Sequence, residues 1–309
     1  MRNFLSYIAS QPWAIWEPKA REILAYLEAR ESGESHPEFE SRLTKRKEQE
    51  TRSSAGSVAV IPVRGAIANR ASLMDGASLG MGTSAERLRQ EIRAACDDKD
   101  TKAVVFDIDS PGGSAQGTPE LAAAIRERSN ETPVIAQIDG LGASAAYWIA
   151  SAADEIVATP SSQIGSIGVL SVHEDISRML EEEGVTETII TSENAPNKAL
   201  GNPYEPLSER GREKMQAMVN KYEDMFIRAI AESRNTTRRD VIENYGQGDV
   251  MIANDALAAG MIDRVGTMGE TLERIGAGNN GSQKRTRAAA RSTALARQRL
   301  ELEREKAHL

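Results

Sequence analysis

Short apolar runs alternate with amphipathic stretches through the middle of this chain. The apolar runs are rich in Val, Ile and Ala, which are typical of buried strands and are short enough to be strands. The run at residues 103–108 is apolar at most positions, as expected for a strand that is covered on both faces. Strands are predicted at residues 58–63, 103–108, 134–138, 155–158, 167–172 and 185–191.

Apolar residues recur at helical spacing between these runs. Thr83-Ser84-Ala85-Glu86 has the pattern of a capping box, and it precedes a stretch in which Leu88, Ile92 and Ala95 share one face. Thr118 is the expected cap of a second helix that starts at Pro119. Further helices are predicted at residues 144–152, at 174–183 before Gly184, and at 208–233.

This order of elements predicts an α/β fold, with a mostly parallel sheet flanked by helices. The chain has 309 residues, which is enough for one large domain with additional arms. Hydrophobic residues make up 40% of the chain and aromatic residues only 4%, so we expect a core of Ala, Ile, Val and Leu.

Three zones follow from the patterning. Residues 1–55 form an N-terminal arm, with helical spacing at 18–30 followed by a charge-rich linker. Residues 56–275 contain all the predicted strands and form the main domain. Residues 276–309 begin with a Gly- and Asn-rich linker and continue into a basic segment that is expected to be helical.

Composition excludes several classes of protein. A net charge of −8 argues against a nucleic-acid-binding protein. Cys96 is the single cysteine, so an intrachain disulfide is impossible and a reducing compartment fits. We expect neither a membrane anchor nor a secretory signal, because no apolar run is long and continuous enough. We also expect no metal or cofactor, because neither a ligand cluster nor a phosphate-binding loop is present.

Ser144 is the strongest candidate for chemistry. It follows the predicted turn at residues 139–142 and begins the apolar helix. A hydroxyl at that position is close to backbone N–H groups, and the small residues Ala143, Ala145 and Ala146 leave the backbone open to a reacting carbonyl. The alternative is that Ser144 only caps the helix, since serine is common at that position.

Two further turns could complete an active site. Ser110-Pro111-Gly112-Gly113 ends a buried strand, and its unshielded N–H groups could bind an oxyanion together with the N–H of Ala145. Gly165-Ser166-Ile167-Gly168 is a second turn of small residues, in which Ser166 could hold a lysine amine by a hydrogen bond. Each turn could also be purely structural.

Lys198 is the candidate general base. It lies in a loop with few other charges, and burial of an amine lowers its pKa enough for it to accept a proton near neutral pH. The alternative is an ordinary solvated lysine. His173 is a second candidate base, whereas His36 and His308 lie in the arms and are poor candidates.

Taken together and in order, these motifs resemble the signal peptide peptidase A (protease IV) family of Ser–Lys peptidases, within the Clp/crotonase fold. The resemblance rests on Asp109-Ser110-Pro111-Gly112-Gly113, on residues 142–154 and on Gly165-Ser166-Ile167-Gly168-Val169, and it covers about residues 58–275. It implies repeated β-β-α units. Residues 198–204 look closest to the bacteriophage branch, the prohead or capsid maturation proteases, and residues 254–265 resemble the closing segment of the family.

The resemblance implies a role for each matching residue. Ser144 matches the nucleophile, Lys198 the general base and Ser166 the residue that orients the lysine, while Gly113 and Ala145 match the oxyanion donors. The family usually has Ser-Gly-Gly where this chain has Ser144-Ala145-Ala146. Ala145 still donates its N–H, so the added methyl groups affect the size of the accepted substrate more than the chemistry.

The function implied is that of a serine endopeptidase that cleaves scaffold, capsid or portal proteins during phage head maturation. Its expected place is the host cytoplasm, within the procapsid, and its expected form is a homo-oligomer. The alternatives are a bacterial cytoplasmic peptidase of the same family, a crotonase-type acyl-CoA enzyme, and a catalytically inactive assembly scaffold.

Overall fold

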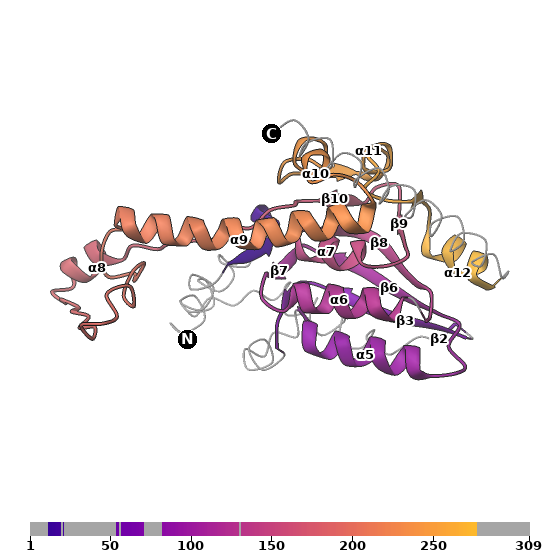
Figure 1. The fold of residues 1–309 in the computed structure, drawn as a ribbon, viewed down its shortest axis with the longest axis horizontal. Coiled ribbons are helices and arrows are strands. Elements are labelled where there is room, and N and C mark those ends of the chain that lie inside the picture. The colour runs from indigo at the N-terminus through magenta and orange to yellow at the C-terminus, as the bar shows by residue number, and fades with distance from the viewer. Residues whose placement is uncertain are drawn as a thin grey trace, which may run out of the picture.

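The computed structural model describes residues 12–19, 21, 54–55, 57–70, 82–129 and 131–276. A twisted sheet forms the centre, and helices cover one of its faces (Figure 1). One long helix of this covering, α9 (Glu209–Arg234), extends beyond the sheet. Its protruding end lies beside α8 (Ser177–Glu182) and the neighbouring loops.

The main sheet has the strand order β11-β10-β8-β6-β3-β2, and β9 and β12 lie off this path. Pairing is parallel along β3, β6, β8 and β10, and antiparallel at the outer strands β2 and β11. The strands are β2 (Ser54–Ala55), β3 (Val58–Arg64), β6 (Ala103–Ser110), β8 (Val134–Ala143), β9 (Glu155–Ala158), β10 (Gln163–Gly165), β11 (Val250–Ile252) and β12 (Arg264–Val265).

Side chains on the two faces of this sheet enter two separate clusters, because alternate residues of a strand point in opposite directions. On β6, Val104 and Phe106 pack under the helical layer, whereas Ala103 and Val105 face α12 (Met268–Gly276). Both faces of β6 are therefore buried, which is why its sequence is apolar at most positions. The expected mostly parallel α/β architecture is confirmed.

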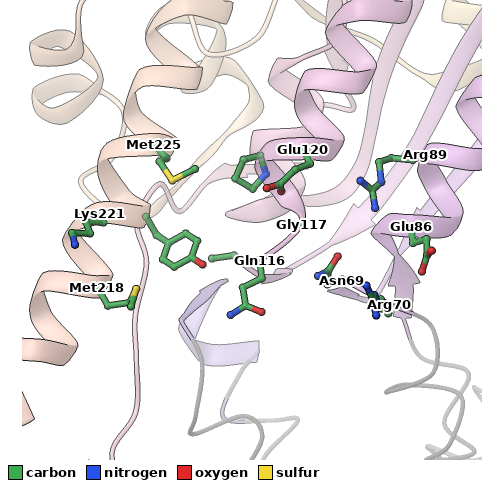
Figure 2. A pocket seen from close by; sticks show the side chains of 13 residues that line it. Asn69, Arg70, Glu86, Arg89, Gln116, Gly117, Glu120, Met218, Lys221 and Met225 are labelled. Atoms are coloured by element: carbon green, nitrogen blue, oxygen red, sulfur yellow. The ribbon is translucent and has the colours of Figure 1, made fainter. Parts of the chain in front are cut away.

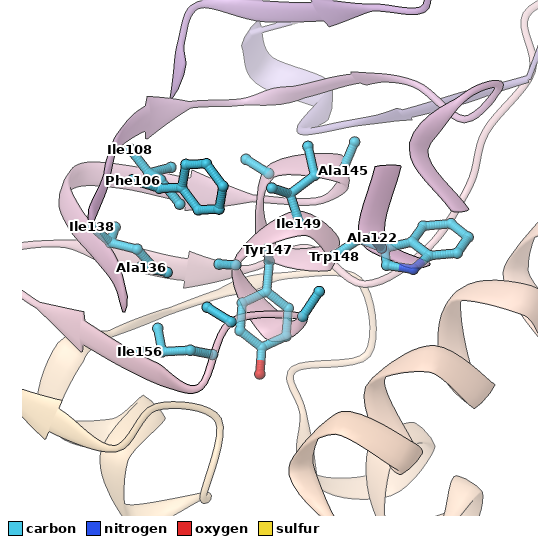
Figure 3. Close-up of a cluster of buried hydrophobic side chains, with 14 of the residues drawn as sticks. Phe106, Ile108, Ala122, Ala136, Ile138, Ala145, Tyr147, Trp148, Ile149 and Ile156 are labelled. Atoms are coloured by element: carbon cyan, nitrogen blue, oxygen red, sulfur yellow. The ribbon is translucent and has the colours of Figure 1, made fainter. Parts of the chain in front are cut away.

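The helical layer consists of α5 (Ala85–Asp97), α6 (Thr118–Arg128), α7 (Ala145–Ser151) and α9. Every residue of α7 is buried, and the helix lies at the centre of the larger cluster (Figure 3). Trp148 on α7 stacks on Phe226 of α9, with ring centroids 4.4 Å apart. Tyr147 points the other way and donates a hydrogen bond to the carbonyl of Met261 (2.8 Å). These contacts fix the start of α7, and hence Ser144.

Two short helices follow α9 along the chain. They are α10 (Arg238–Asn244) and α11 (Ala253–Ala258). Arg234, at the end of α9, donates to both carboxylate oxygens of Asp263 at 3.0 Å, and Asp263 also accepts from the amide of Ile156 on β9. The guanidinium of Arg234 is nearly buried, so its bidentate pair with Asp263 joins α9 to the edge of the sheet.

A second, smaller sheet has the order β1-β7-β4-β5. Its strands are β1 (Trp13–Ile15), β7 (Gly112–Ser114), β4 (Ala66–Ala68) and β5 (Gly82–Ser84). The indigo strand β1 comes from the predicted N-terminal arm, yet it lies antiparallel against β7 of the main domain (Figure 1). The packing of this segment was not predicted from the sequence.

Two predicted strands are wrong. Residues 185–191 have no regular structure, since none of the described strands pairs with them, and Ile190 there is 90% exposed. At 167–172 only Leu170 makes an isolated bridge, to Trp13, while the strand of this region is β10, just upstream. Hydrophobic β-branched residues favour a strand, but they do not determine whether a partner strand is present in the fold.

The predicted turn at residues 139–142 is the second half of β8. The pairing of β6 with β8 shifts register after Ile108, so that Ser110 lies opposite Gly142. The first half of β8 pairs with β9 and its end pairs with β10, so the strand changes partner at this irregularity. The change of partner brings the end of β10 beside the end of β8.

Two predicted helix caps are displaced by one residue. Ser84, not Thr83, caps α5, because the Thr83 hydroxyl donates to the carbonyl of Arg64 instead. Gly117 occupies the cap position of α6 with φ of 85°, and the Thr118 hydroxyl donates to the carbonyl of Ser114. The helix predicted at residues 174–183 corresponds to α8, which is shorter and spans Ser177–Glu182.

Most of the predicted arms lie outside the described residues. This applies to the helix at 18–30 apart from residues 18–19 and 21, to the charged linker up to residue 53, and to the tail after 276. Among the described residues, no helix is both long and apolar enough to cross a membrane. Cys96 is half-buried, and burial raises the pKa of its thiol.

Candidate active site

Ser144 occupies a strained backbone position between β8 and α7. Its φ of 55° and ψ of −120° are rare for a residue with a side chain. Its amide donates to the carbonyl of Gly165 (2.7 Å), and its carbonyl accepts from the amide of Trp148 (2.9 Å). A sharp strand-to-helix turn of this kind aims a serine hydroxyl away from the sheet.

The hydroxyl of Ser144 is not explained by helix capping. It stands at the N-cap of α7 but makes no capping bond. Ser144 is 1% exposed, and its Oγ is buried with no hydrogen-bond partner among the described residues. An unpaired buried hydroxyl costs about 1–3 kcal/mol, so a purely structural role does not account for it.

The glycine turn after β6 lies directly against the start of α7. A Cβ built on Gly112 would be 2.8 Å from the amide nitrogen of Ala145 and 2.9 Å from the carbonyl oxygen of Ala143. Only glycine allows this approach, since any side chain would collide with backbone, and the φ of 94° also favours glycine. The structure therefore brings the predicted oxyanion turn to Ser144.

Gly113 is equally constrained. A Cβ there would be 1.9 Å from the carbonyl oxygen of Ile67 on β4. The turn is braced by Ser110, whose Oγ donates to the carbonyl of Gly65 (2.6 Å) and accepts from the amide of Gly112 (3.2 Å). Ser110 belongs to the predicted motif, but its bracing role was not predicted, although its position before Pro-Gly-Gly could have suggested it.

Ser166 lies beside Ser144 at the ends of two paired strands. Gly165 lies opposite Ala143 in the parallel ladder, so the next residue of each strand is the serine. Ser166 also has a positive φ, of 52°, is 6% exposed and donates its amide to the carbonyl of Asp249 (2.7 Å). The two hydroxyl-bearing residues are therefore held side by side by sheet pairing.

Lys198 is not brought to Ser144 within one chain. It lies exposed in the loop between α8 and α9, and that loop lies at the far end of α9 from α7 (Figure 1). A Cβ on Gly211 would lie 3.6 Å from the amide of Gly201 in the same loop. From Gly211 to Phe226, which holds α7, a helix rises about 22 Å, well beyond the reach of a lysine side chain.

His173, the alternative base, belongs to the same outlying region. Its Nε2 lies 3.0 Å from the carbonyl oxygen of Asn202, which follows Lys198 in the loop. The contact joins the segment before α8 to the lysine loop. His173 therefore contributes to the packing of this region, and no contact joins it to Ser144.

An open cavity of about 580 Å³ begins where β7 ends (Figure 2). Residues 115–117 form its floor, and α9 supplies one wall through Met218, Tyr222 and Met225. The opposite wall is polar, with Asn69 and Arg70. Figure 2 shows Gln116 between the two walls. The cavity has room for several side chains of an extended peptide.

The family model for peptidase family S49 matches residues 126–280, about half of the chain. This part includes Ser144, Ser166 and Lys198. The chain belongs to peptidase family S49, as the sequence motifs predicted.

Several curated proteins are similar. Protease 4 of Salmonella typhi is 31% identical, over 70% of this chain and 34% of its own length. Capsid assembly protease C of Escherichia phage lambda is 29% identical, over 67% of this chain and 46% of its own. Head-tail preconnector protein GP5 of Enterobacteria phage P21 is 34% identical, over 56% and 34% respectively. The matched region spans less than half the length of each of these three relatives.

Proposed function

We propose that this protein is a serine endopeptidase in which Ser144 is the nucleophile. The observation that carries the proposal is the contact of the Gly112-Gly113 turn with the amide of Ala145, immediately after a serine whose buried hydroxyl has no partner in the described part of the chain. Gly113 and Ala145 would donate their N–H groups to the oxyanion. Stabilisation by one such donor is worth about 10²–10³ in rate.

In the proposed reaction, Ser144 Oγ attacks the carbonyl carbon of a peptide bond, and its proton passes to the neutral amine of Lys198. The amine then returns the proton to the leaving nitrogen, and the C–N bond breaks to leave an acyl-enzyme. Water, deprotonated by the same amine, attacks the ester, and Ser144 leaves as the restored hydroxyl. Ser166 would hold the amine by a hydrogen bond.

The position of Lys198 supports a site completed by a second copy of the chain. The lysine loop is exposed at the far end of α9, along with large apolar side chains such as Met179, Ile189 and Ile190. Packing this end against the Ser144 face of a neighbouring copy would bury those side chains and bring in the amine. The homo-oligomer expected from the resemblance is thus part of the proposed mechanism.

We further propose that the peptidase acts in phage head assembly, inside the procapsid in the host cytoplasm, on scaffold, capsid or portal proteins. Support comes from the names of two relatives, a capsid assembly protease and a head-tail preconnector protein, both from phages. A related bacterial peptidase without a capsid role is the second candidate, favoured by the similarity to protease 4. The acyl-CoA alternative has no support from the family match.

One experiment tests both the assignment of Ser144 as the nucleophile and the role in phage head assembly. Wild-type protein and the Ser144→Ala variant are each expressed with candidate scaffold and capsid proteins, and the products are compared by mass spectrometry. We expect new peptide termini only with the wild type. Termini that also appear with Ser144→Ala would contradict the nucleophile. Cleavage of a general peptide, with intact scaffold and capsid proteins, would favour the second candidate.

A further inference from the structure

Strand β1 lies in the groove beside the candidate oxyanion turn. On its β7 side, the amide of Trp16 donates to the carbonyl of Pro111 (2.8 Å), and the amide of Ala115 donates to the carbonyl of Pro12 (3.3 Å). Hydrogen-bonded pairs of an antiparallel ladder recur at every second residue. The pair Ala14–Gly113 lies midway between these two, so the N–H of Gly113 faces the carbonyl of Ala14.

The other edge of β1 is paired as well. Trp13 donates its amide to the carbonyl of Leu170 (2.8 Å) and accepts the amide of Leu170 (2.9 Å). Leu170 follows Ser166 by four residues. The segment of residues 12–16 is therefore an extended peptide held on both sides, by the glycine turn and by the stretch after Ser166. This is how a groove binds a peptide by β-strand addition.

The carbonyl of Ala14 points at the site where an oxyanion would form. A Cβ built on Gly112 would be 2.3 Å from the Ala14 oxygen and 2.8 Å from the Ala145 nitrogen. The small space that a Cβ on Gly112 would fill thus borders both the Ala14 oxygen and the Ala145 nitrogen, and the N–H of Gly113 faces the same oxygen. Ala14 is fully buried, and Ser144 Oγ is covered, so a substrate carbonyl cannot enter while this segment is in place.

We propose that residues 12–16 are an internal inhibitor that occupies the peptide-binding groove in the manner of a substrate. The inference rests on the proposed function of Ser144. Within a single chain the Ala14–Ile15 bond stays intact, because Lys198 reaches Ser144 only when a second copy supplies it. A substrate segment has to displace β1 before it can react, and it would pair with β7 in the same antiparallel direction.

The groove also defines the expected substrate. The residue whose carbonyl enters the oxyanion site is expected to be small, since Ala14 is fully buried within the main hydrophobic cluster. Pro12 pairs with Ala115, the first residue of the cavity floor. Residues on the amino-terminal side of the bound segment would therefore run toward the cavity, where Tyr222 and Met225 offer apolar surface and Asn69 offers polar contacts.

Occupancy is tested without catalysis by peptide binding. In the Ser144→Ala background, the double substitution Trp13→Asp and Ile15→Asp would expel β1, because two carboxylates cannot stay in that buried strand. A fluorescent peptide with the sequence of residues 10–18 is then titrated by anisotropy. We expect it to bind the double variant at least about tenfold more tightly than Ser144→Ala alone. The reason is that only protein molecules with an empty groove bind the peptide, so the apparent affinity falls in proportion to the fraction of such molecules.

Glu17→Ala is the matched control, because Glu17 is exposed just after the strand. It should bind the peptide as weakly as the parent protein. Equal binding by the parent and the double variant, or no binding by either, would overturn the proposal. If the double variant does not fold, Ala14→Pro removes a single ladder donor and is tested in the same way.

A second measurement separates this proposal from the proposed function. With Ser144 intact, a fluorophosphonate probe should label Ser144 faster in both β1 variants than in wild type. If the wild type is labelled, slower or unchanged labelling in folded variants would mean that β1 is only structural. If none is labelled but the difference in peptide affinity persists, the internal inhibitor stands and the reactive serine does not.

Discussion

The amide of Ser144 donates a hydrogen bond to the carbonyl oxygen of Gly165 at 2.7 Å. This bond continues the ladder of β8 and β10 by one step and holds Ser144 next to Ser166, the residue after Gly165. Both serines adopt a positive φ. Two turns that are far apart in the sequence are therefore locked together by backbone pairing, and their side chains are free for other contacts.

Replacing Ser144 by Ala should separate activity from stability. Peptide hydrolysis should fall by at least about 10³-fold, as expected for loss of a nucleophile. The free energy of unfolding should not decrease, because the lost hydroxyl is buried and no described residue bonds to it. Enzyme kinetics and denaturant titration measure the two effects.

Ser151→Ala is the control, since the Ser151 hydroxyl only donates to the carbonyl of Trp148 on the same helix. It should keep its activity. A Ser144→Ala protein that still hydrolyses peptides at the wild-type rate would exclude this serine as the nucleophile.

Mixing inactive variants should restore activity if the lysine comes from another copy. Ser144→Ala and Lys198→Ala proteins are each expected to be inactive. After mixing and subunit exchange, some sites would contain an intact Ser144 from one chain and an intact Lys198 from another. We expect a partial recovery of the hydrolysis rate.

Ser144→Ala mixed with a Ser144→Ala/Lys198→Ala double variant is the control and should stay inactive. If verified subunit exchange gives no recovery in the test mixture, Lys198 does not act between copies.

Gly113→Ala should damage the oxyanion turn. Its Cβ would meet the carbonyl oxygen of Ile67 at 1.9 Å, so β7 must move away from β4 and carry the N–H with it. A loss of about 10²–10³ in kcat/KM is expected from one misplaced donor. Gly168→Ala is the comparison, because no atom lies within 4 Å of its added Cβ. Equal activity of the two variants would argue against an oxyanion role for the turn.

Truncating Trp148 should loosen α9 from the domain. Its stacking with Phe226 fills the centre of the helical layer, and such a truncation costs about 3–5 kcal/mol of unfolding free energy. Trp148→Phe should cost much less, since it keeps a ring and removes an indole N–H that has no partner among the described residues. Thermal denaturation of the two variants gives the comparison, and equal losses would contradict the stacking argument.

Tyr147 should remain un-ionised in the folded protein at high pH. Complete burial raises the pKa of its phenol far above the usual value of about 10. Its contribution to stability is therefore fully present below the pKa of the unfolded chain and is lost as pH rises above it. Tyr147→Phe should flatten this decline above pH ~10, as measured by denaturant titration at several pH values.

Tyr147→Phe should also lower the unfolding free energy near neutral pH by about 1–2 kcal/mol, because the carbonyl of Met261 loses its donor. Tyr204→Phe, at an exposed position, is the control and should change neither quantity. An unchanged pH dependence in Tyr147→Phe would show that other groups cause the decline.

Much of the fold could be predicted from local pattern. The strands beginning at Val58, Ala103 and Val134 start where their apolar runs start, because burial on both sheet faces demands such runs. The failures at 167–172 and 185–191 have one cause: β-branched residues favour a strand only where a partner strand exists, and partners are chosen by the tertiary fold. The start of α5 was missed by one residue because the Thr83 hydroxyl bonds to distant Arg64.

The sequence by itself determined which residues have the chemistry: Ser144 between small neighbours, the Pro-Gly-Gly turn and Ser166. It did so because nucleophiles and close backbone contacts require particular residue types at short spacings. Only the tertiary structure decided how these parts meet. It joined the glycine turn to Ala145. It also placed the Lys198 loop at the far end of α9 from α7, and hence away from Ser144. It also placed Ala14 at the site, because β-sheet hydrogen bonds join segments regardless of their separation in the chain.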